Sequence, residues 1–210
     1  NVSFKAQNGQ VTGLLGPNGA GKSTTLRILY GLFAADSGSA KVDGIDTRTN
    51  RIAAQKIMGI MPDARGLYVR LTAREHIKYF GRLHGMSEQR LEVRTEELLD
   101  LLDMQNIADR KVEGFSQGER TKVCLARALV HEPANVILDE PTNGLDVMTT
   151  RAVRELITEL KRQNIAVLFS SHLMHEVARL CDEIIIVASG AVVATGSAEQ
   201  ISAFAQEENL

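Results

Sequence analysis

Residues 16–24 read Gly-Pro-Asn-Gly-Ala-Gly-Lys-Ser-Thr, between a short apolar run at residues 11–15 and an apolar helical pattern that begins at Leu26. This is the phosphate-binding loop G-x-x-x-x-G-K-[ST] in a strand–loop–helix setting, which indicates an α/β fold. Its glycines let the backbone turn tightly and direct N–H groups at phosphate oxygens, and the dipole of the following helix adds to that attraction. The alternative is a glycine-rich turn that happens to precede a lysine.

The loop predicts a nucleotide, a metal ion and a class of reaction together. Lys22 is expected to reach the β- and γ-phosphates of a nucleoside triphosphate, and the Ser23 hydroxyl is expected to ligate Mg²⁺. The candidate nucleotide contacts are Gly16, Pro17, Asn18, Gly19, Ala20, Gly21, Lys22, Ser23 and Thr24.

Composition narrows the remaining classes of protein. A chain of 210 residues, 44% apolar and 24% charged, is typical of one globular α/β domain. The net charge is -2 and no block of Lys and Arg is present, so nucleic acid is not expected as a partner. No apolar stretch approaches the roughly 18 residues that span a bilayer, so no direct membrane span is expected. Cys124 and Cys181 lack metal-like spacing and are expected to be thiols.

Strand-like and helical segments alternate along most of the chain, which is typical of a buried, mostly parallel sheet. Strands are expected at residues 11–15, 39–42, 57–61, 136–138, 166–169 and 184–187, and helices at 149–162 and 173–180. Asp43-Gly44 predicts a tight hairpin turn, and residues 184–194 are expected to form a second hairpin.

The pattern is helical from about residue 71 to residue 129. Thr72 with Glu75, and Ser116 with Glu119, have the form of helix capping boxes. Leu98, Leu99, Leu101 and Leu102 are expected to form one buried stripe.

We expect a single domain over residues 1–210. Residues 1–62 and 130–210 would form an α/β core, and residues 63–129 an inserted helical subdomain. The first residues, 1–4, resemble the middle of a sheet and Asn1 is not a Met, so an N-terminal segment is expected to be missing.

Asp139 and Glu140 follow the apolar strand at residues 136–138, so their carboxylates are expected at the strand's carboxyl end, where α/β proteins bind ligands. Asp139 suits a second contact to Mg²⁺, and Glu140 suits the activation of an attacking water. A strand that ends in two acids at a surface turn is common, so the assignment depends on the phosphate loop.

Three further motifs resemble those of the ATP-binding cassette (ABC) ATPases. Residues 115–119, Phe-Ser-Gln-Gly-Glu, resemble the signature sequence of that family, and residues 143–146, Asn-Gly-Leu-Asp, resemble its D-loop. His172, which follows an expected strand and Ser170-Ser171, is similar to the switch histidine. The order and spacing match from residue 1 to about residue 195.

The resemblance implies a P-loop NTPase fold with a RecA-like core, a mostly parallel sheet, a small antiparallel β part and an inserted α-helical subdomain. It implies that ATP lies between the phosphate loop of one subunit and the signature residues of a second ABC subunit, in a homodimer. Ser116, Gln117, Gly118, Glu119 and Asp146 would then contact the nucleotide, and His172 would contact the γ-phosphate. Ser116 and Asp146 could instead only cap the helices that follow them.

The remaining histidines have no such setting. His76, His84, His131 and His175 are expected at the surface. His172 and His175 could imitate a metal-binding pair, but no further ligand is apparent and zinc is not expected.

Two positions depart from the family pattern. Asp63 stands where the family has a Gln that contacts Mg²⁺ and links the site to the membrane partner, and an Asp there can still ligate Mg²⁺ but adds negative charge. Gln117 stands where the commonest signature has Gly, a variant similar to the branch that works with ABC-2-type exporters. The family stacks adenine on an aromatic residue before the loop; Phe4 is poorly placed for this, and the true partner is expected in the missing N-terminal segment.

The resemblance implies the ATPase subunit of an exporter, held at the cytoplasmic face of the inner membrane by an integral membrane permease. Tyr68, Leu71 and Tyr79 could contact that permease or belong to the core. Residues 62–75 are similar to ATPase subunits of bacterial sodium-exporting systems, which suggests Na⁺ efflux. The alternatives are a non-transport ABC ATPase with a soluble partner, in translation or DNA maintenance, and a nucleotide-binding regulator without turnover.

Overall fold

The computed structural model describes residues 1–63 and 66–207, and side chains up to residue 203. Ala64 and Arg65, within the segment compared above with sodium exporters, lie outside the described residues, as do residues 208–210. A six-stranded sheet in the order β4-β5-β6-β1-β7-β8 forms the centre, with every neighbouring pair parallel except β7 and β8. The strands are β1 (Val11–Leu15), β4 (Met58–Met61), β5 (Asn135–Asp139), β6 (Ala166–Ser171), β7 (Glu183–Ala188) and β8 (Ala191–Gly196).

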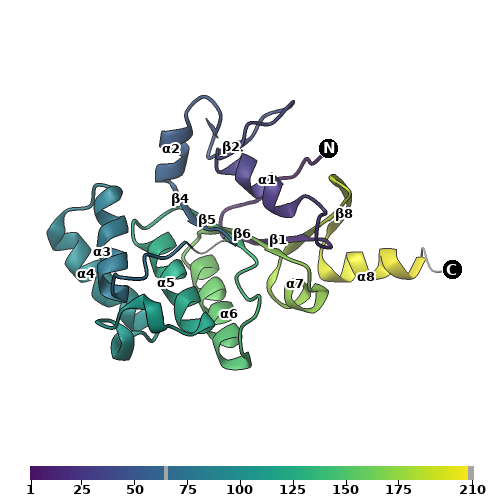
Figure 1. Cartoon of the computed structure of the whole chain (residues 1–210). Coiled ribbons are helices and arrows are strands. Elements are labelled where there is room, and N and C mark those ends of the chain that lie inside the picture. Colours follow the sequence, from purple (N-terminus) through teal and green to yellow (C-terminus); the bar gives the residue numbers. More distant parts are fainter. Residues whose placement is uncertain (64–65, 208–210) are drawn as a thin grey trace.

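Helices cover both faces of this sheet (Figure 1). They are α1 (Lys22–Leu29), α2 (Arg51–Lys56), α3 (Ala73–Leu83), α4 (Glu88–Leu101), α5 (Gln117–Leu129), α6 (Val147–Arg162), α7 (Met174–Leu180) and α8 (Ala198–Glu207). Within the described residues, no helix is long and apolar enough to cross a bilayer.

Alternate residues of each central strand enter two separate cores, as the period of a strand requires. Leu14, Ile137 and Leu168 pack with Leu26 of α1 on one face. The other strand residues pack against α5, α6 and α7; Phe169, for example, is fully buried there. Figure 1 shows α1 and α2 on one side of the sheet and α5, α6 and α7 on the other. Sheet and helices on both faces confirm the predicted P-loop NTPase fold.

Both predicted capping boxes are present. The Thr72 hydroxyl accepts from the Glu75 N–H while the Glu75 carboxylate accepts from the Thr72 N–H, and Ser116 and Glu119 repeat the pattern at α5. Leu98, Leu99 and Leu102 are buried as expected. Leu101 is 47% exposed, so its place in the buried stripe was wrong: it is the last residue of α4, on the side away from the core.

The predicted hairpins are also confirmed. β7 and β8 pair antiparallel, and β2 (Lys41–Val42) pairs with β3 (Ile45–Asp46) across a turn in which Asp43 and Gly44 have φ values of 47° and 80°. Positive φ at both central residues is the geometry of a tight hairpin turn and favours Gly. Residues 1–4 form no strand, contrary to the expectation from sequence. Both cysteines lie in the described part of the chain, and neither forms a disulfide.

Candidate functional site

Three neighbouring parallel strands end at one edge of the sheet and carry most of the predicted site. β1 leads into the phosphate loop, β5 ends at Asp139, and β6 ends at Ser171, one residue before His172. Because the carboxyl ends of parallel strands meet at the same edge, segments more than a hundred residues apart in sequence converge there. The Gly16 N–H donates to the Ser171 carbonyl at 3.3 Å, which joins the start of the loop to the end of β6.

The conformation of the loop depends on its glycines and on hydrogen bonds from Lys22 to its backbone. Gly19 and Gly21 have φ values of 81° and 103°, which side chains other than glycine rarely adopt. The Lys22 Nζ donates to the carbonyls of Gly16 at 2.7 Å and of Pro17 at 3.3 Å, so the lysine closes the loop over itself. Ser23 and Thr24 follow in the first turn of α1, where free backbone N–H groups and the helix dipole favour an anion.

A chain of charged side chains crosses the edge of the sheet. The Lys22 ammonium lies 3.3 Å from Glu140 Oε1, and His172 Nδ1 lies 2.9 Å from Glu140 Oε2. The Lys22 and Glu140 side chains are only 6% and 12% exposed. Glu140 therefore stands between a cation of the phosphate loop and an imidazole that can donate to it.

Ser170 organises the two acids, a role that was not predicted from sequence. It is fully buried, and its hydroxyl donates to Asp139 Oδ1 at 2.5 Å while accepting from the Glu140 N–H at 3.0 Å. Asp139 and Ser170 are direct partners in the β5–β6 register. The sequence signal was the polar pair Ser170-Ser171 at the end of an apolar strand.

Glu140 has a left-handed backbone, with φ of 50°. A non-glycine residue in this region is uncommon and costs of order 1 kcal/mol, and such residues cluster at functional sites. The hydrogen bond from its N–H to Ser170 supports this conformation.

The signature residues form a second group, at the start of α5 and α6. The Ser116 hydroxyl accepts from the Glu119 N–H at 3.2 Å, and the Ser116 backbone N–H holds the pKa of Glu119 below its usual range. A Cβ on Gly118 would lie 2.8 Å from the Thr149 hydroxyl of α6, so a larger residue would displace the Thr149 side chain and its bond to Asp146. Asp146 caps α6 through the Thr149 N–H at 2.9 Å, and the same bond lowers its pKa.

The family profile described as "ABC transporter" matches residues 1–143 of this chain. The chain belongs to the ABC transporter ATPase family. It is an ATP-hydrolysing, nucleotide-binding subunit of an ABC transporter, and the comparisons favour transport over the non-transport alternative.

Curated relatives agree along the whole ABC domain. The chain is 41% identical over all its residues to the ABC transporter ATP-binding protein NatA of Bacillus subtilis, of which it covers 85%. It is 36% identical over 93% of its length to the linearmycin resistance ATP-binding protein LnrL of the same species, and 38% over 93% to a Nod factor export ATP-binding protein I of Burkholderia lata. The chain spans 63% and 64% of the length of these last two relatives.

Solved ABC structures superpose closely. An ATP-binding subunit of an ABC transporter matches with a TM-score of 0.89 and 30% identity, over 98% of this chain and 86% of that one. MJ0796, a bacterial ABC transporter cassette solved as a dimer, matches with a TM-score of 0.85 and 27% identity, over 94% and 89% of the two chains.

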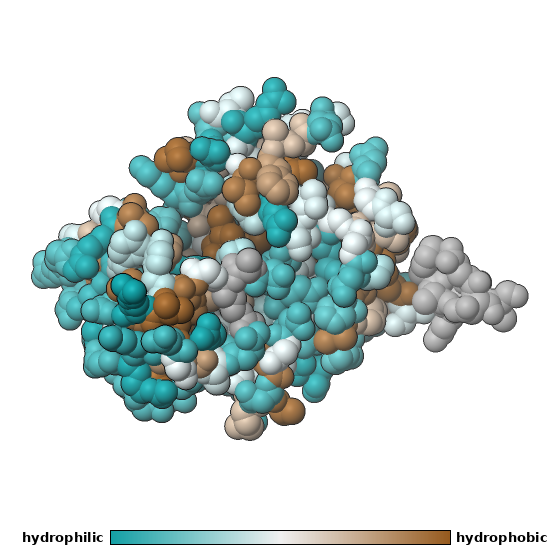
Figure 2. All heavy atoms as spheres, in the orientation of Figure 1, coloured by the Kyte–Doolittle hydropathy of each residue, from teal (hydrophilic) through white to brown (hydrophobic). Residues whose placement is uncertain are grey.

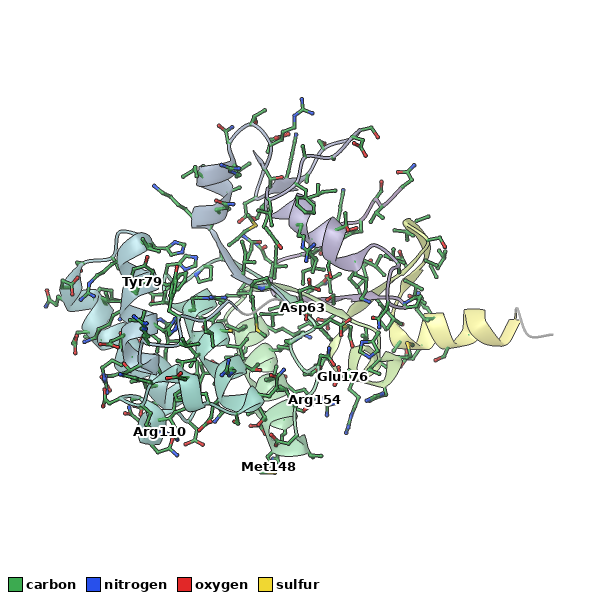
Figure 3. All side chains as sticks on the ribbon, viewed as in Figure 1. Asp63, Tyr79, Arg110, Met148, Arg154 and Glu176 are labelled. Carbon is green, nitrogen blue, oxygen red and sulfur yellow. The ribbon has the colours of Figure 1, made fainter. Side chains whose placement is uncertain are left out.

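The structure also places Asp63 and the four histidines that had no motif setting. Asp63, labelled in Figure 3, is exposed two residues after β4. Because Met61 of β4 pairs with Leu138 of β5, Asp63 follows β4 at the same sheet edge as Asp139. His175 is exposed as predicted. His76, His84 and His131 are not surface residues: His76 is fully buried, and the other two are half-buried and stacked on each other. His76 lies on the buried side of α3, whereas His84 caps the end of α3 and His131 follows the end of α5, where the two rings cover each other.

A cavity of about 1050 Å³ adjoins the ABC phosphate loop. Gly21 and Thr24 line it, together with residues 1–8 and 35–43. Phe4, the aromatic residue considered for adenine stacking, is among the lining residues. The described residues contain no group of three or more His, Cys, Asp or Glu side chains that could hold a metal ion unaided.

Proposed function

We propose that the edge formed by β1, β5 and β6 binds and hydrolyses Mg-ATP. The chain of contacts from Lys22 through Glu140 to His172 carries this proposal. The loop residues 16–24 bind the triphosphate through backbone N–H groups, and Lys22 neutralises the β- and γ-phosphates.

The oxygen donors at this edge fit Mg²⁺, which prefers hard oxygen ligands and keeps several waters. Ser23 and Asp139 would hold it, with Asp63 as a further ligand; Mg²⁺ supplies neutralisation of charge on the β- and γ-oxygens. The Ser170 hydroxyl orients the Asp139 carboxylate for that task. Because protein side chains would supply only two or three ligands, phosphate oxygens and water would have to supply the others.

Glu140 acts as the general base that takes a proton from the attacking water, and His172 holds Glu140 from the other side and donates to the γ-phosphate. Because Nδ1 of His172 lies 2.9 Å from Oε2 of Glu140, a change in the position of either side chain would shift the other. The alternative of a nucleotide-binding regulator without turnover is disfavoured by the presence of both groups.

We propose that a second copy of the chain supplies Ser116, Gln117, Gly118 and Glu119 to the γ-phosphate, with Asp146 beside them at the interface. The start of α5 is a positive helix end, and it lies across the sheet from α1 (Figure 1). The dimeric structure of MJ0796 supports a dimer, and the head-to-tail arrangement of the two copies is our proposal from the signature residues.

An integral membrane permease is the proposed partner, with this subunit at the cytoplasmic face of the inner membrane. Residues 63–129 would act as the helical subdomain that docks on it, and residues 1–62 and 130–210 as the nucleotide-binding core. Tyr68 and Tyr79 are 52% and 39% exposed and pack edge to face, while Leu71 is half-buried. Figure 2 shows apolar side chains gathered on this part of the surface, over α3 and α5.

Na⁺ is the proposed exported species. The resemblance of residues 62–75 to subunits of sodium-exporting systems supports it, together with 41% identity to NatA over the whole chain. Sodium flux in vesicles that contain this subunit and its permease would test the proposal, with K⁺ as the control ion.

The ATPase assignment is tested by Glu140→Gln. Steady-state hydrolysis should fall at least about 100-fold because the general base is lost. ATP should bind as tightly as to wild type or tighter, because Lys22 loses a competing anion. Glu155→Gln on the exposed surface of α6 is the matched control and should leave turnover unchanged. Unchanged turnover in Glu140→Gln would remove Glu140 from the mechanism.

The transport assignment is tested by affinity capture of tagged protein from detergent-solubilised membranes, with identification by mass spectrometry. A polytopic membrane protein should be recovered, and Tyr79→Ala should weaken its recovery. Leu101→Ala, at a similarly exposed position on α4, is the control and should not weaken it. Recovery of ribosomes or a soluble partner alone would contradict transport.

A further inference from the structure

Glu176, on the first turn of α7, is a buried carboxylate that touches three other segments. It is 5% exposed, and its Oε2 accepts from the Thr142 hydroxyl at 2.5 Å and from the Ser171 hydroxyl at 3.2 Å. Its Oε1 lies 3.7 Å from Nη2 of Arg154 on α6. Figure 3 places Glu176 and Arg154 next to each other.

This arrangement is costly for a purely structural contact. A buried carboxylate needs compensation, and the only charged partner among the described residues sits at the far limit of an ion pair. The Arg154 Nε is itself buried without a hydrogen-bond partner. Apolar side chains of similar size could fill the same space without this penalty, which points to a further role for the acid.

The partners of Glu176 flank the two groups proposed to perform hydrolysis. Thr142 is two residues after Glu140, and Ser171 is directly before His172. The Ser171 hydroxyl also accepts from the Leu173 N–H at 3.0 Å, and the Ser171 carbonyl accepts from the Gly16 N–H. Ser171 therefore bonds to the residue after His172 and to the first residue of the phosphate loop. Glu176 therefore ties together the two loops whose tips carry the 2.9 Å contact between Glu140 and His172.

We propose that Glu176 is a positioning residue for hydrolysis, which holds the Glu140 loop against the His172 loop through Thr142 and Ser171. This inference rests on the proposed function. Displacement of a reacting group by about 1 Å can cost 100-fold in rate. The ATP contacts of residues 16–24 do not pass through Thr142, so the effect of losing this link falls on turnover and not on nucleotide affinity.

The test is Thr142→Val, which removes one hydroxyl and keeps the shape of the side chain. We expect kcat to fall about 10-fold, with KM for ATP changed by less than about twofold. Thr95→Val is the matched control: Thr95 is also buried and donates to the Leu91 carbonyl at 2.7 Å within α4. It should lower Tm to a similar extent and leave kcat unchanged.

Two substitutions at Glu176 complete the test. Glu176→Gln keeps an acceptor for both hydroxyls and should retain most turnover, whereas Glu176→Ala should lose at least as much as Thr142→Val. The Thr142→Val/Glu176→Ala double variant should lose no more than Glu176→Ala alone, because the two residues act as one link.

If Thr142→Val lowers Tm as Thr95→Val does but keeps kcat, or raises KM alone, Glu176 is merely structural and the inference is overturned. If Glu176→Ala does not fold, Thr142→Val still decides. Glu140→Gln in the same assay distinguishes the proposed function from the positioning role. Retained turnover in Glu140→Gln would refute the proposed function. Lost turnover in Glu140→Gln together with a normal kcat in Thr142→Val would refute only the positioning role of Glu176.

Discussion

The Lys22 ammonium lies 3.3 Å from Oε1 of Glu140, so the cation of the phosphate loop and the proposed general base form a buried ion pair. Lys22 also donates to two loop carbonyls, which leaves it ready to exchange one anionic partner for another. A triphosphate and Glu140 thus compete for the same ammonium, and nucleotide binding would free the carboxylate to act on water.

Lys22→Ala is expected to weaken ATP binding about 10- to 100-fold, because a charge-assisted contact to phosphate contributes about 1.5–3 kcal/mol. A fluorescent-nucleotide titration measures this, with Lys56→Ala on the exposed end of α2 as the control. Wild-type affinity in Lys22→Ala would contradict the role of the lysine.

Ser170→Ala removes the hydroxyl that joins Asp139 to the Glu140 backbone. Leaving two buried polar groups without this partner should cost about 1–3 kcal/mol of stability. The Mg²⁺ concentration for half-maximal ATPase should also rise, since Asp139 loses its orienting bond. Ser87→Ala, which removes the cap of α4, should lower stability without changing Mg²⁺ dependence. If both variants need the same Mg²⁺ concentration for half-maximal ATPase, Ser170 does not contribute to the metal site.

Ser116 can cap α5, contact a phosphate, or do both, and two substitutions separate these roles. Ser116→Ala should lose about 1 kcal/mol of stability because the N-cap is lost. Ser116→Asp should keep the cap and stability but lower ATPase at least about 10-fold, because it opposes a carboxylate to the γ-phosphate. Urea unfolding and steady-state turnover measure the two effects. Normal turnover in Ser116→Asp would restrict Ser116 to capping.

Stability should fall with acidification through His131. Burial and the neighbouring His84 lower the pKa of His131 to about 4, from an ordinary value of 6.5. The unfolded chain therefore binds this proton more readily, so the free energy of unfolding is highest above pH 6.5 and declines toward pH 4. After allowance for solvent screening at a half-buried ring, the loss should be about 1–2 kcal/mol.

Urea midpoints between pH 7.5 and pH 4.5 test this expectation. His131→Phe keeps an aromatic ring against His84 and should flatten the decline, although it loses the bond from Nε2 to the Met58 carbonyl. His175→Gln, at an exposed position, should follow the wild-type profile. Parallel profiles for wild type and His131→Phe would exclude His131 as the source.

The parts of the fold that could be predicted from the sequence are those set by neighbouring residues. The capping boxes at Thr72 and Ser116, the hairpin turn at Asp43-Gly44 and the strand–loop–helix of the phosphate loop depend on residues within a few positions of one another. Errors arose where burial is set by distant elements. His76 is hidden by the packing of α3, and Leu101 is exposed because α4 ends there.

The sequence by itself determined the family, the triphosphate loop and the identity of the polar residues at the strand ends, because motif spacing carries that information. Only the tertiary structure decided how those residues meet: Ser170 bridging Asp139 and Glu140, Glu140 between Lys22 and His172, and Glu176 joining Thr142 to Ser171. These contacts follow from the parallel register of β5, β6 and β1, which is set by burial of both sheet faces and not by any one segment.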